Sequence, residues 1–351
     1  MKLLVVGAGA VGSVYGYLAG LISDSAETCE VTFLVKPQHR KNLEKGLNLY
    51  QWRGKIAAPL LFKNYSIIDS LKELKRISLM KSFDAVLITL PSDKVAADGW
   101  LTELFESSGT AKIWSLQPNL KDREFILNAG KSVFGSEFEN RVVWGRIPMM
   151  SYLAPLPGED FTESGYAFYI PPGAKAAWSC SHLPNAEKVA DFYNSHGLPS
   201  KAVKDFVGES IFSEAFLRGL VAGLEKSEWS FSKLMNGINL PLVTESIREM
   251  TAIQSQALGL TDPGRKWWAR AATSRSGIKN ALRLARLFIP FDLEAFFRVH
   301  FTKVETQMHS GIQECISMGK AQGQSTTNLT LLKGRAHKSK LDTACISTPL
   351  C

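Results

Sequence analysis

Short apolar runs alternate with longer segments of mixed polarity through the first half of the chain. Residues 3–6, 30–36, 83–91, 111–118 and 141–147 are rich in branched and aromatic side chains and have the length of buried strands. More polar segments, several of them long enough for helices, separate these runs. The alternation is typical of an α/β fold built on a parallel sheet.

The intervening segments carry signals of their own. We expect a helix after the first strand through about Ser23 and a hairpin within 165–181, where two apolar runs flank Pro-Pro-Gly. The other expected elements are a short helix in 37–50 that ends at Gly46, a helix or loop at 67–78, and helices at 94–107 and 185–199.

From about residue 205 the pattern changes to apolar residues at helical spacing. We therefore predict two domains and a tail. They are a Rossmann-type dinucleotide-binding domain over 1–205, an all-helical domain over 206–335 and a loose polar tail over 336–351.

Three glycines follow the first apolar run at once, in the pattern G-x-G-x-x-G. An export signal is the alternative interpretation, but only four apolar residues precede the glycines. In a dinucleotide-binding turn the first glycine permits a tight turn, the second lets the backbone approach a pyrophosphate, and the third lets the helix pack closely on the strand. The N–H groups at the helix start then attract the anion. The residues assigned to cofactor binding here are Gly7, Ala8, Gly9, Ala10, Val11 and Gly12.

Composition narrows the class of protein. The chain has 351 residues, 45% hydrophobic and 21% charged, which is the profile of an ordinary globular protein. No apolar run reaches the roughly 18 residues of a membrane span. The five cysteines include no C-x-x-C pair, and the six histidines show neither H-x-x-x-H nor H-E-x-x-H spacing. We therefore expect no disulfide framework, no metal site and a cytoplasmic setting.

Much of the net charge of +8 is concentrated in one segment. The charged residues between Asp262 and Asp292 are all basic: Arg265, Lys266, Arg270, Arg275, Lys279, Arg283 and Arg286. Such a segment can contact anionic lipid or nucleic acid, or it can be a helix with a solvated basic face that packs on a larger core. We favour the packed helix, and we expect neither a nucleic-acid partner nor contact with a membrane surface.

The second strand ends in basic residues. The sequence LVKPQHRK (34–41) contains Lys36, Arg40 and Lys41 and no carboxylate. An acidic residue there would bind the ribose 2′-OH of NAD, whereas a cation suits the 2′-phosphate of NADP. Solvated charges at a helix start are the alternative. We expect NADP as the cofactor, bound in part by Lys36 and Arg40.

The ordered motifs together resemble the ketopantoate reductase family, the NADPH-dependent 2-dehydropantoate 2-reductases. The stretches that carry the resemblance are 1–16, 33–49, 83–95, 115–120 and 303–332. The resemblance implies a Rossmann-type domain followed by a helical domain like the C-terminal domain of 6-phosphogluconate dehydrogenase. It also implies reduction of a 2-keto acid by NADPH, a place in pantothenate biosynthesis, and a homodimer as a possible assembly.

The resemblance also assigns individual residues. It extends the cofactor site to Pro91, Gln117 and Asn119. Glu305, six residues before Gly311, falls where the family has its substrate-binding glutamate.

The other residues that handle substrate in this family are largely replaced. The family's proton-donating lysine opens a Lys-x-x-x-Asn-x-x-x-Asn pattern on one helix face, and the best match here has Arg218, Ala222 and Lys226. Arg218 keeps a cation, although a guanidinium is a poor proton donor near neutral pH. Pro91 stands in place of a second lysine, and Leu293 lies about where a serine is expected.

The candidate catalytic residues are therefore Arg218, Lys226 and Glu305, with water as another proton source. His300 with Glu305 is an alternative acid pair, Lys94 is an alternative to the lysine that Pro91 replaces, and Arg218 can equally be a cation exposed beside the cleft. Two functions follow: an NADPH-dependent reductase of a 2-keto acid with altered substrate, or a non-catalytic NADP-binding sensor or interaction protein.

Overall fold

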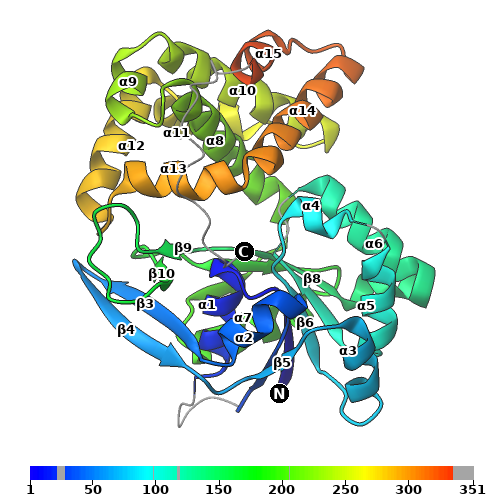
Figure 1. Cartoon of the computed structure of the whole chain (residues 1–351). Coiled ribbons are helices and arrows are strands. Elements are labelled where there is room, and N and C mark those ends of the chain that lie inside the picture. The colour runs from blue at the N-terminus through cyan, green and yellow to red at the C-terminus, as the bar shows by residue number, and fades with distance from the viewer. Residues whose placement is uncertain (22–27, 98, 117–118, 205, 335–351) are drawn as a thin grey trace. The chain divides into compact units, whose positions relative to one another are not determined.

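The computed structural model describes residues 1–21, 28–97, 99–116, 119–204 and 206–334, apart from the side chains of Asp93 and Arg265. Among these residues one compact unit comprises Met1–Phe206, and a second begins at Val207 (Figure 1). The predicted tail at 336–351 lies outside the described residues.

An eight-stranded sheet forms the centre of the first unit, in the order β12-β11-β8-β7-β6-β1-β2-β5. Its strands in chain order are β1 (Lys2–Val6), β2 (Glu30–Leu34), β5 (Ser66–Ile68), β6 (Ala85–Ile88), β7 (Lys112–Ser115), β8 (Val142–Arg146), β11 (Ala176–Ser179) and β12 (Ser200–Ala202). All neighbours from β5 to β8 pair in parallel, while β11 runs antiparallel to β8. The predicted parallel α/β sheet is confirmed.

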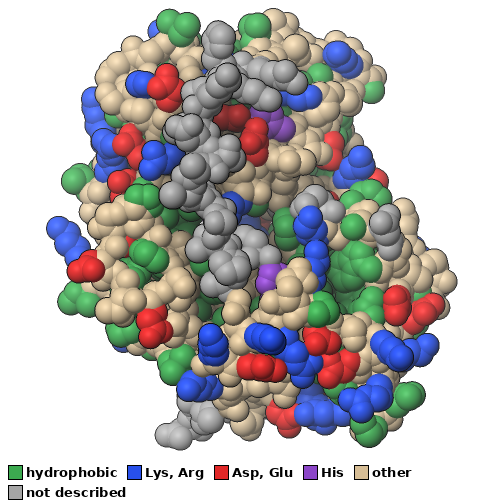
Figure 2. Space-filling model, viewed as in Figure 1, with side chains coloured by type: hydrophobic (Ala, Val, Ile, Leu, Met, Phe, Trp, Pro, Cys, Tyr) green, Lys and Arg blue, Asp and Glu red, His purple; other side chains and the backbone are tan. Residues whose placement is uncertain are grey.

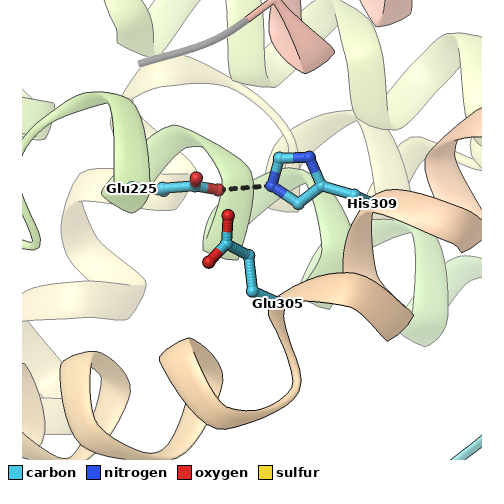
Figure 3. Close-up of side chains that lie close together, drawn as sticks. All are labelled: Glu225, Glu305 and His309. Atoms are coloured by element: carbon cyan, nitrogen blue, oxygen red, sulfur yellow. Dashed lines mark hydrogen bonds and ion pairs between the residues drawn. The ribbon is translucent and has the colours of Figure 1, made fainter. Parts of the chain in front are cut away.

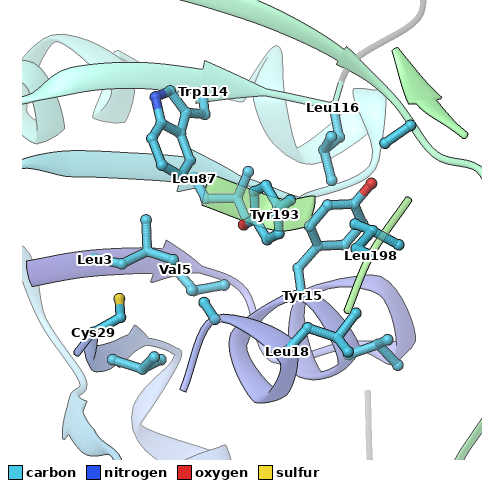
Figure 4. Close-up of a cluster of buried hydrophobic side chains, with 14 of the residues drawn as sticks. Leu3, Val5, Tyr15, Leu18, Cys29, Leu87, Trp114, Leu116, Tyr193 and Leu198 are labelled. Atoms are coloured by element: carbon cyan, nitrogen blue, oxygen red, sulfur yellow. The ribbon is translucent and has the colours of Figure 1, made fainter. Parts of the chain in front are cut away.

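Helices cover both faces of this sheet, which explains why the sequences of its strands are uninterrupted apolar runs. Successive side chains of β1 point to opposite faces. Leu3 and Val5 enter one buried cluster, shown in Figure 4, and Leu4 and Val6 enter another. Helices supply the other side of each cluster.

The helices of the first unit follow the strands as a doubly wound fold requires. They are α1 (Ala10–Ala19), α2 (Pro37–Leu43), α3 (Leu71–Ser78), α4 (Ser92–Val95), α5 (Trp100–Ser108), α6 (Leu120–Phe134), the 3₁₀ helix η1 (Ser136–Arg141) and α7 (Leu183–Ser195). The predicted helices in 37–50 and 185–199 are confirmed as α2 and α7. The segment 67–78, expected as a helix or a loop, is divided between β5 and α3.

Two helix predictions are wrong in extent. α1 ends at Ala19, and Gly20 is its C-cap residue, a position where glycine is common. Ser23, the predicted end, lies outside the described residues. The single helix expected at 94–107 is two helices, since α5 starts after Gly99, whose φ of +61° is left-handed.

A second sheet of four strands, in the order β4-β3-β10-β9, packs on α1. Its strands are β3 (Leu47–Arg53), β4 (Ile56–Phe62), β9 (Met150–Ala154) and β10 (Gly165–Tyr169). The hairpin predicted within 165–181 is wrong, because β10 pairs with β3 and β9 here while β11 belongs to the large sheet. Pro-Pro-Gly thus connects two sheets: β10 pairs with the nearby β9 and the distant β3, while β11 pairs with β8 and β12.

The described part of the second unit is helical. Its elements are α8 (Phe206–Lys226), α9 (Phe231–Asn236), α10 (Asn239–Ala257), the 3₁₀ helix η2 (Pro263–Arg265), α11 (Trp267–Ala272), α12 (Arg275–Phe288), α13 (Leu293–Lys303), α14 (Glu305–Ala321) and α15 (Thr327–Lys333). The basic segment is mostly α11 and α12, and α12 buries Ile278 and Leu282 while Arg283 is exposed. The expectation of a packed helix with a basic face is therefore confirmed.

Candidate functional site

The turn between β1 and α1 requires glycine at two positions. Gly7 has a φ of +97°, a left-handed conformation that favours glycine, and its N–H donates to the Leu34 carbonyl at 2.9 Å. A Cβ on Gly12 would lie 2.2 Å from the Gly7 carbonyl oxygen and 2.6 Å from Thr89 Oγ1. The tight turn and the close helix packing predicted for these two glycines are both present.

Gly9 leaves open space at the start of α1. It is exposed, it is the N-cap residue, and a Cβ added there would meet nothing within 4 Å. The N–H of Ser13 makes the first hydrogen bond of the helix, to the Gly9 carbonyl at 2.8 Å. The N–H groups of the residues before Ser13 in the first turn, Ala10 to Gly12, therefore have no acceptor within the helix. No side chain caps α1, and its first turn contains no acid. This helix start can accept an anion.

The turn lies where the sheet changes its winding direction. β1 is flanked by β2 and β6, and the last residue of β1, Val6, pairs with Leu34 and with Ile88. The carboxyl ends of these three parallel strands therefore meet at one edge of the sheet. In doubly wound folds the ligand crevice lies outside that edge. Thr89, just beyond β6, closes the turn by donating its hydroxyl to the Val6 carbonyl at 2.9 Å.

The two cations predicted to bind a 2′-phosphate have different surroundings. Lys36 is exposed at the N-cap of α2, directly after the second strand. Arg40, one turn further on, contacts three carboxylates: Asp69 at 3.1 Å, Glu44 at 3.2 Å and Glu73 at 3.3 Å. These hydrogen bonds, first the one to Asp69, raise the pKa of the Arg40 guanidinium. Lys36 is the cation better placed to accept a new anionic partner.

The other residues assigned to the cofactor lie near α4 and α6. Pro91 is exposed at the N-cap of α4. Asn119 is buried, and its side-chain amide donates to Ser92 Oγ at 3.0 Å and to Asp122 Oδ2 at 3.1 Å, which ties α4 to α6. Gln117 lies outside the described residues. A cofactor contact for Pro91 or Asn119 is still a prediction.

In the second unit, Arg218 does not lie on the surface. The whole residue is 6% exposed, and Nη2 is 3.4 Å from Glu214 Oε2 on the same helix. Its guanidinium packs over Gly311 of α14, where a Cβ would lie 2.9 Å from Nε. The alternative that Arg218 is an exposed cation is therefore wrong, because it fills the space that Gly311 leaves between two helices. Lys226, two turns further along α8, donates to the Gly334 carbonyl.

Glu305 has two polar neighbours, and the sequence analysis connected it to neither. Figure 3 shows Glu305 and His309 on α14 facing Glu225 on α8, and the candidate donor atoms of the three residues all lie within 4.8 Å of one another. His309 Nε2 is 2.8 Å from Glu225 Oε2, and this hydrogen bond is the largest cause that raises the pKa of the imidazole. The E-x-x-x-H spacing of Glu305 and His309 was the available signal, because residues four apart share a helix face.

His300, the alternative partner for Glu305, lies on a different helix. It belongs to α13, where its ring stacks on Phe296 with 5.1 Å between centroids. Leu293, where a serine was expected, is a buried apolar residue at the start of the same helix.

Surface charge and hydropathy add two observations. On the face drawn in Figure 2, Lys and Arg side chains lie among Asp and Glu rather than forming one large basic patch. None of the helices in the described part of the chain combines the length and apolar character that a bilayer span demands.

The chain matches no protein-family model and no curated protein at the sequence level. Solved structures resemble it throughout. A PanE/ApbA family ketopantoate reductase from Ralstonia eutropha JMP134 has a TM-score of 0.64 at 17% identity, over 95% of this chain and 96% of that one. A 2-dehydropantoate 2-reductase from Geobacter metallireducens GS-15 has a TM-score of 0.63 at 17% identity, over 95% and 98%. A D-mandelate dehydrogenase solved with NADH and anilino(oxo)acetate has a TM-score of 0.62 at 14% identity, over 95% and 96%.

At these identities the likeness establishes the fold. The architecture that the motif resemblance implies, an N-terminal parallel-sheet unit followed by a helical one, is thereby confirmed.

Proposed function

We propose that this protein is an NADPH-dependent reductase of a 2-keto acid. The observation that carries the proposal is the start of α1: an exposed, uncapped helix N-terminus behind a left-handed Gly7, at the switch point of a doubly wound sheet. The fold shared with ketopantoate reductases and with a mandelate dehydrogenase supports the reaction class.

The residues of the turn fit a dinucleotide. A pyrophosphate needs close approach to the backbone, and the open space at Gly9 allows it. The N–H groups of Ala10, Val11 and Gly12 would hold its oxygens. When bound, the nicotinamide supplies a hydride to the carbonyl carbon of the substrate. The chain itself must orient the two reactants and bring a proton to the carbonyl oxygen.

Selectivity for NADPH over NADH is proposed for Lys36. An ammonium group at this place can pair with the 2′-phosphate, whereas Arg40 must first leave its carboxylates. Lys36→Ala should weaken NADPH binding by about ten- to a hundred-fold, since a hydrogen bond to a charged group contributes about 1.5–3 kcal/mol. NADH affinity should stay unchanged. An equal loss of affinity for NADPH and NADH would show that Lys36 does not bind the 2′-phosphate.

The substrate contacts are proposed for the second unit. Glu305 stands at the position where the family resemblance has a substrate-binding glutamate. Lys226 is the better proton donor of the two candidate cations, because an ammonium gives up a proton more readily than a guanidinium does. 2-Dehydropantoate is the first substrate to test, and a place in pantothenate biosynthesis depends on its turnover.

The deciding experiment is a fluorescence titration of the purified full chain with NADPH, followed by 2-dehydropantoate and then a panel of 2-keto acids. We expect saturable binding and then loss of the reduced-cofactor signal with at least one acid. Turnover that Glu305→Gln abolishes while NADPH binding persists would support substrate contact by this residue. Absence of NADPH binding would refute the proposal.

Binding without turnover of any keto acid would favour the second candidate, a non-catalytic NADP-binding protein. One observation favours it: Arg218 is packed on Gly311 beside Glu214, and Lys226 donates to a backbone carbonyl, so both cations already have partners within the second unit.

A further inference from the structure

The second unit brings together three side chains that commonly ligate metal ions. Glu305 and His309 are one turn apart on α14, and Glu225 reaches them from α8 (Figure 3). Each offers one donor atom, and these atoms all lie within 4.8 Å of one another. The cluster therefore depends on how two helices pack, because Glu225 and His309 are 84 residues apart in the chain.

The spacing suits a small divalent ion. Zinc lies about 2.0–2.2 Å from nitrogen and oxygen ligands, so two donors on one tetrahedral ion are about 3.3–3.6 Å apart. His309 Nε2 and Glu225 Oε2 are already 2.8 Å apart. If these two atoms moved apart by about 0.5–0.8 Å, an ion could take the place of the proton between them.

The charges also call for a cation. Two carboxylates share the site; the imidazolium proton can balance one of them, and the Lys333 ammonium acts on the cluster from outside it. The histidine and Glu225 side chains are 29% and 21% exposed, and Glu305 is exposed, so an ion could enter from solvent and keep water in its open coordination positions.

We propose that Glu225, Glu305 and His309 form a binding site for a divalent transition-metal ion, with Zn²⁺ as the favoured ion. One imidazole nitrogen and two carboxylate oxygens are a borderline donor set that suits zinc and its spectroscopic substitute Co²⁺. The sequence prediction of no metal site rested on the spacing of the cysteines and histidines, whereas two of the three residues here are glutamates. The site shares Glu305 with the proposed substrate contact, but ion binding is measured without turnover and can be tested separately.

The test uses the untagged, chelator-treated full chain. Zn²⁺ is titrated by calorimetry and Co²⁺ by its visible absorption. We expect one ion per chain, and at least a ten-fold loss of affinity in each of Glu225→Gln, Glu305→Gln and His309→Ala. His182→Ala and Glu245→Gln remove an exposed histidine and an exposed glutamate outside the cluster, so both should bind like the wild type.

Two results would overturn the proposal: no binding of either ion at millimolar concentration, or unchanged affinity in the His309→Ala and Glu305→Gln variants. Circular dichroism and the NADPH titration, run on the same samples, separate loss of the site from loss of the fold. Because the cofactor turn lies in the first unit, failure of metal binding with intact NADPH binding leaves the proposed function standing.

Discussion

At the scale of single residues, the three glycines of the turn differ in whether the fold itself requires glycine. Gly7 is required by its left-handed backbone, Gly12 by a neighbouring carbonyl, and Gly9 by neither, since its φ is −75° and the space around it is open. A requirement of the fold and a requirement of ligand binding can therefore be separated by substitution.

Gly9→Asp and Gly12→Ala should have opposite consequences. Aspartate is a favoured N-cap residue, so Gly9→Asp should keep or slightly raise the free energy of unfolding while weakening NADPH more than about ten-fold, because its carboxylate repels the pyrophosphate. Gly12→Ala should cost about 3 kcal/mol, because its methyl group has no room. Chemical denaturation and NADPH titration of both variants check this. Wild-type affinity in Gly9→Asp would place the cofactor elsewhere.

At the scale of elements, α1 and α7 are held to the sheet by an aromatic cluster. The Tyr193 ring stacks on Trp178, with 5.4 Å between centroids and 4° between planes, and meets Tyr15 edge-on at 5.2 Å. All three side chains are fully buried. The hydroxyl of Tyr193 has no hydrogen-bond partner among the residues that the structure describes, and burial raises its pKa well above the usual value.

Tyr193→Phe should therefore stabilise the protein, while Tyr193→Ala should destabilise it. Removing an unpaired buried hydroxyl should raise the free energy of unfolding by about 1 kcal/mol. Removing the ring should lower it by about 3–5 kcal/mol, because a cavity replaces the stacked contacts. Denaturant titrations measure both values. A loss of stability in Tyr193→Phe would mean that a buried water or another group satisfies the hydroxyl.

At the scale of the whole molecule, the two candidate ligand sites belong to different units. The glycine turn and Lys36 belong to the first unit, and the Glu225, Glu305 and His309 cluster belongs to the second. A ligand of one unit stabilises that unit by mass action.

NADPH at a hundred times its Kd should raise the free energy of unfolding of the first unit by about 2.7 kcal/mol. Differential scanning calorimetry with and without NADPH measures the shift in Tm. The Gly9→Asp variant is the matched control: with an affinity at least ten-fold weaker, its stabilisation at the same concentration should be at most about 1.4 kcal/mol, about half that of the wild type. An unchanged Tm of the wild-type protein under saturating NADPH would contradict cofactor binding to the native state.

The sequence by itself determined what depends on neighbours along the chain. A short apolar run before G-x-G-x-x-G is enough to predict β1, the turn and α1, because period and turn chemistry are local properties. The order of alternating elements likewise predicts the parallel sheet, and the helical spacing of apolar residues from about residue 205 predicts the helical second half.

Only the tertiary structure decided which distant segments meet. β10 and β11 have similar apolar patterns, yet they join different sheets because their hydrogen-bond partners come from remote strands. Arg40 finds Asp69 and Glu73, Arg218 is buried over Gly311, and His309 meets Glu225 for the same reason. These partners on other elements are set by packing between elements, and no local pattern records them.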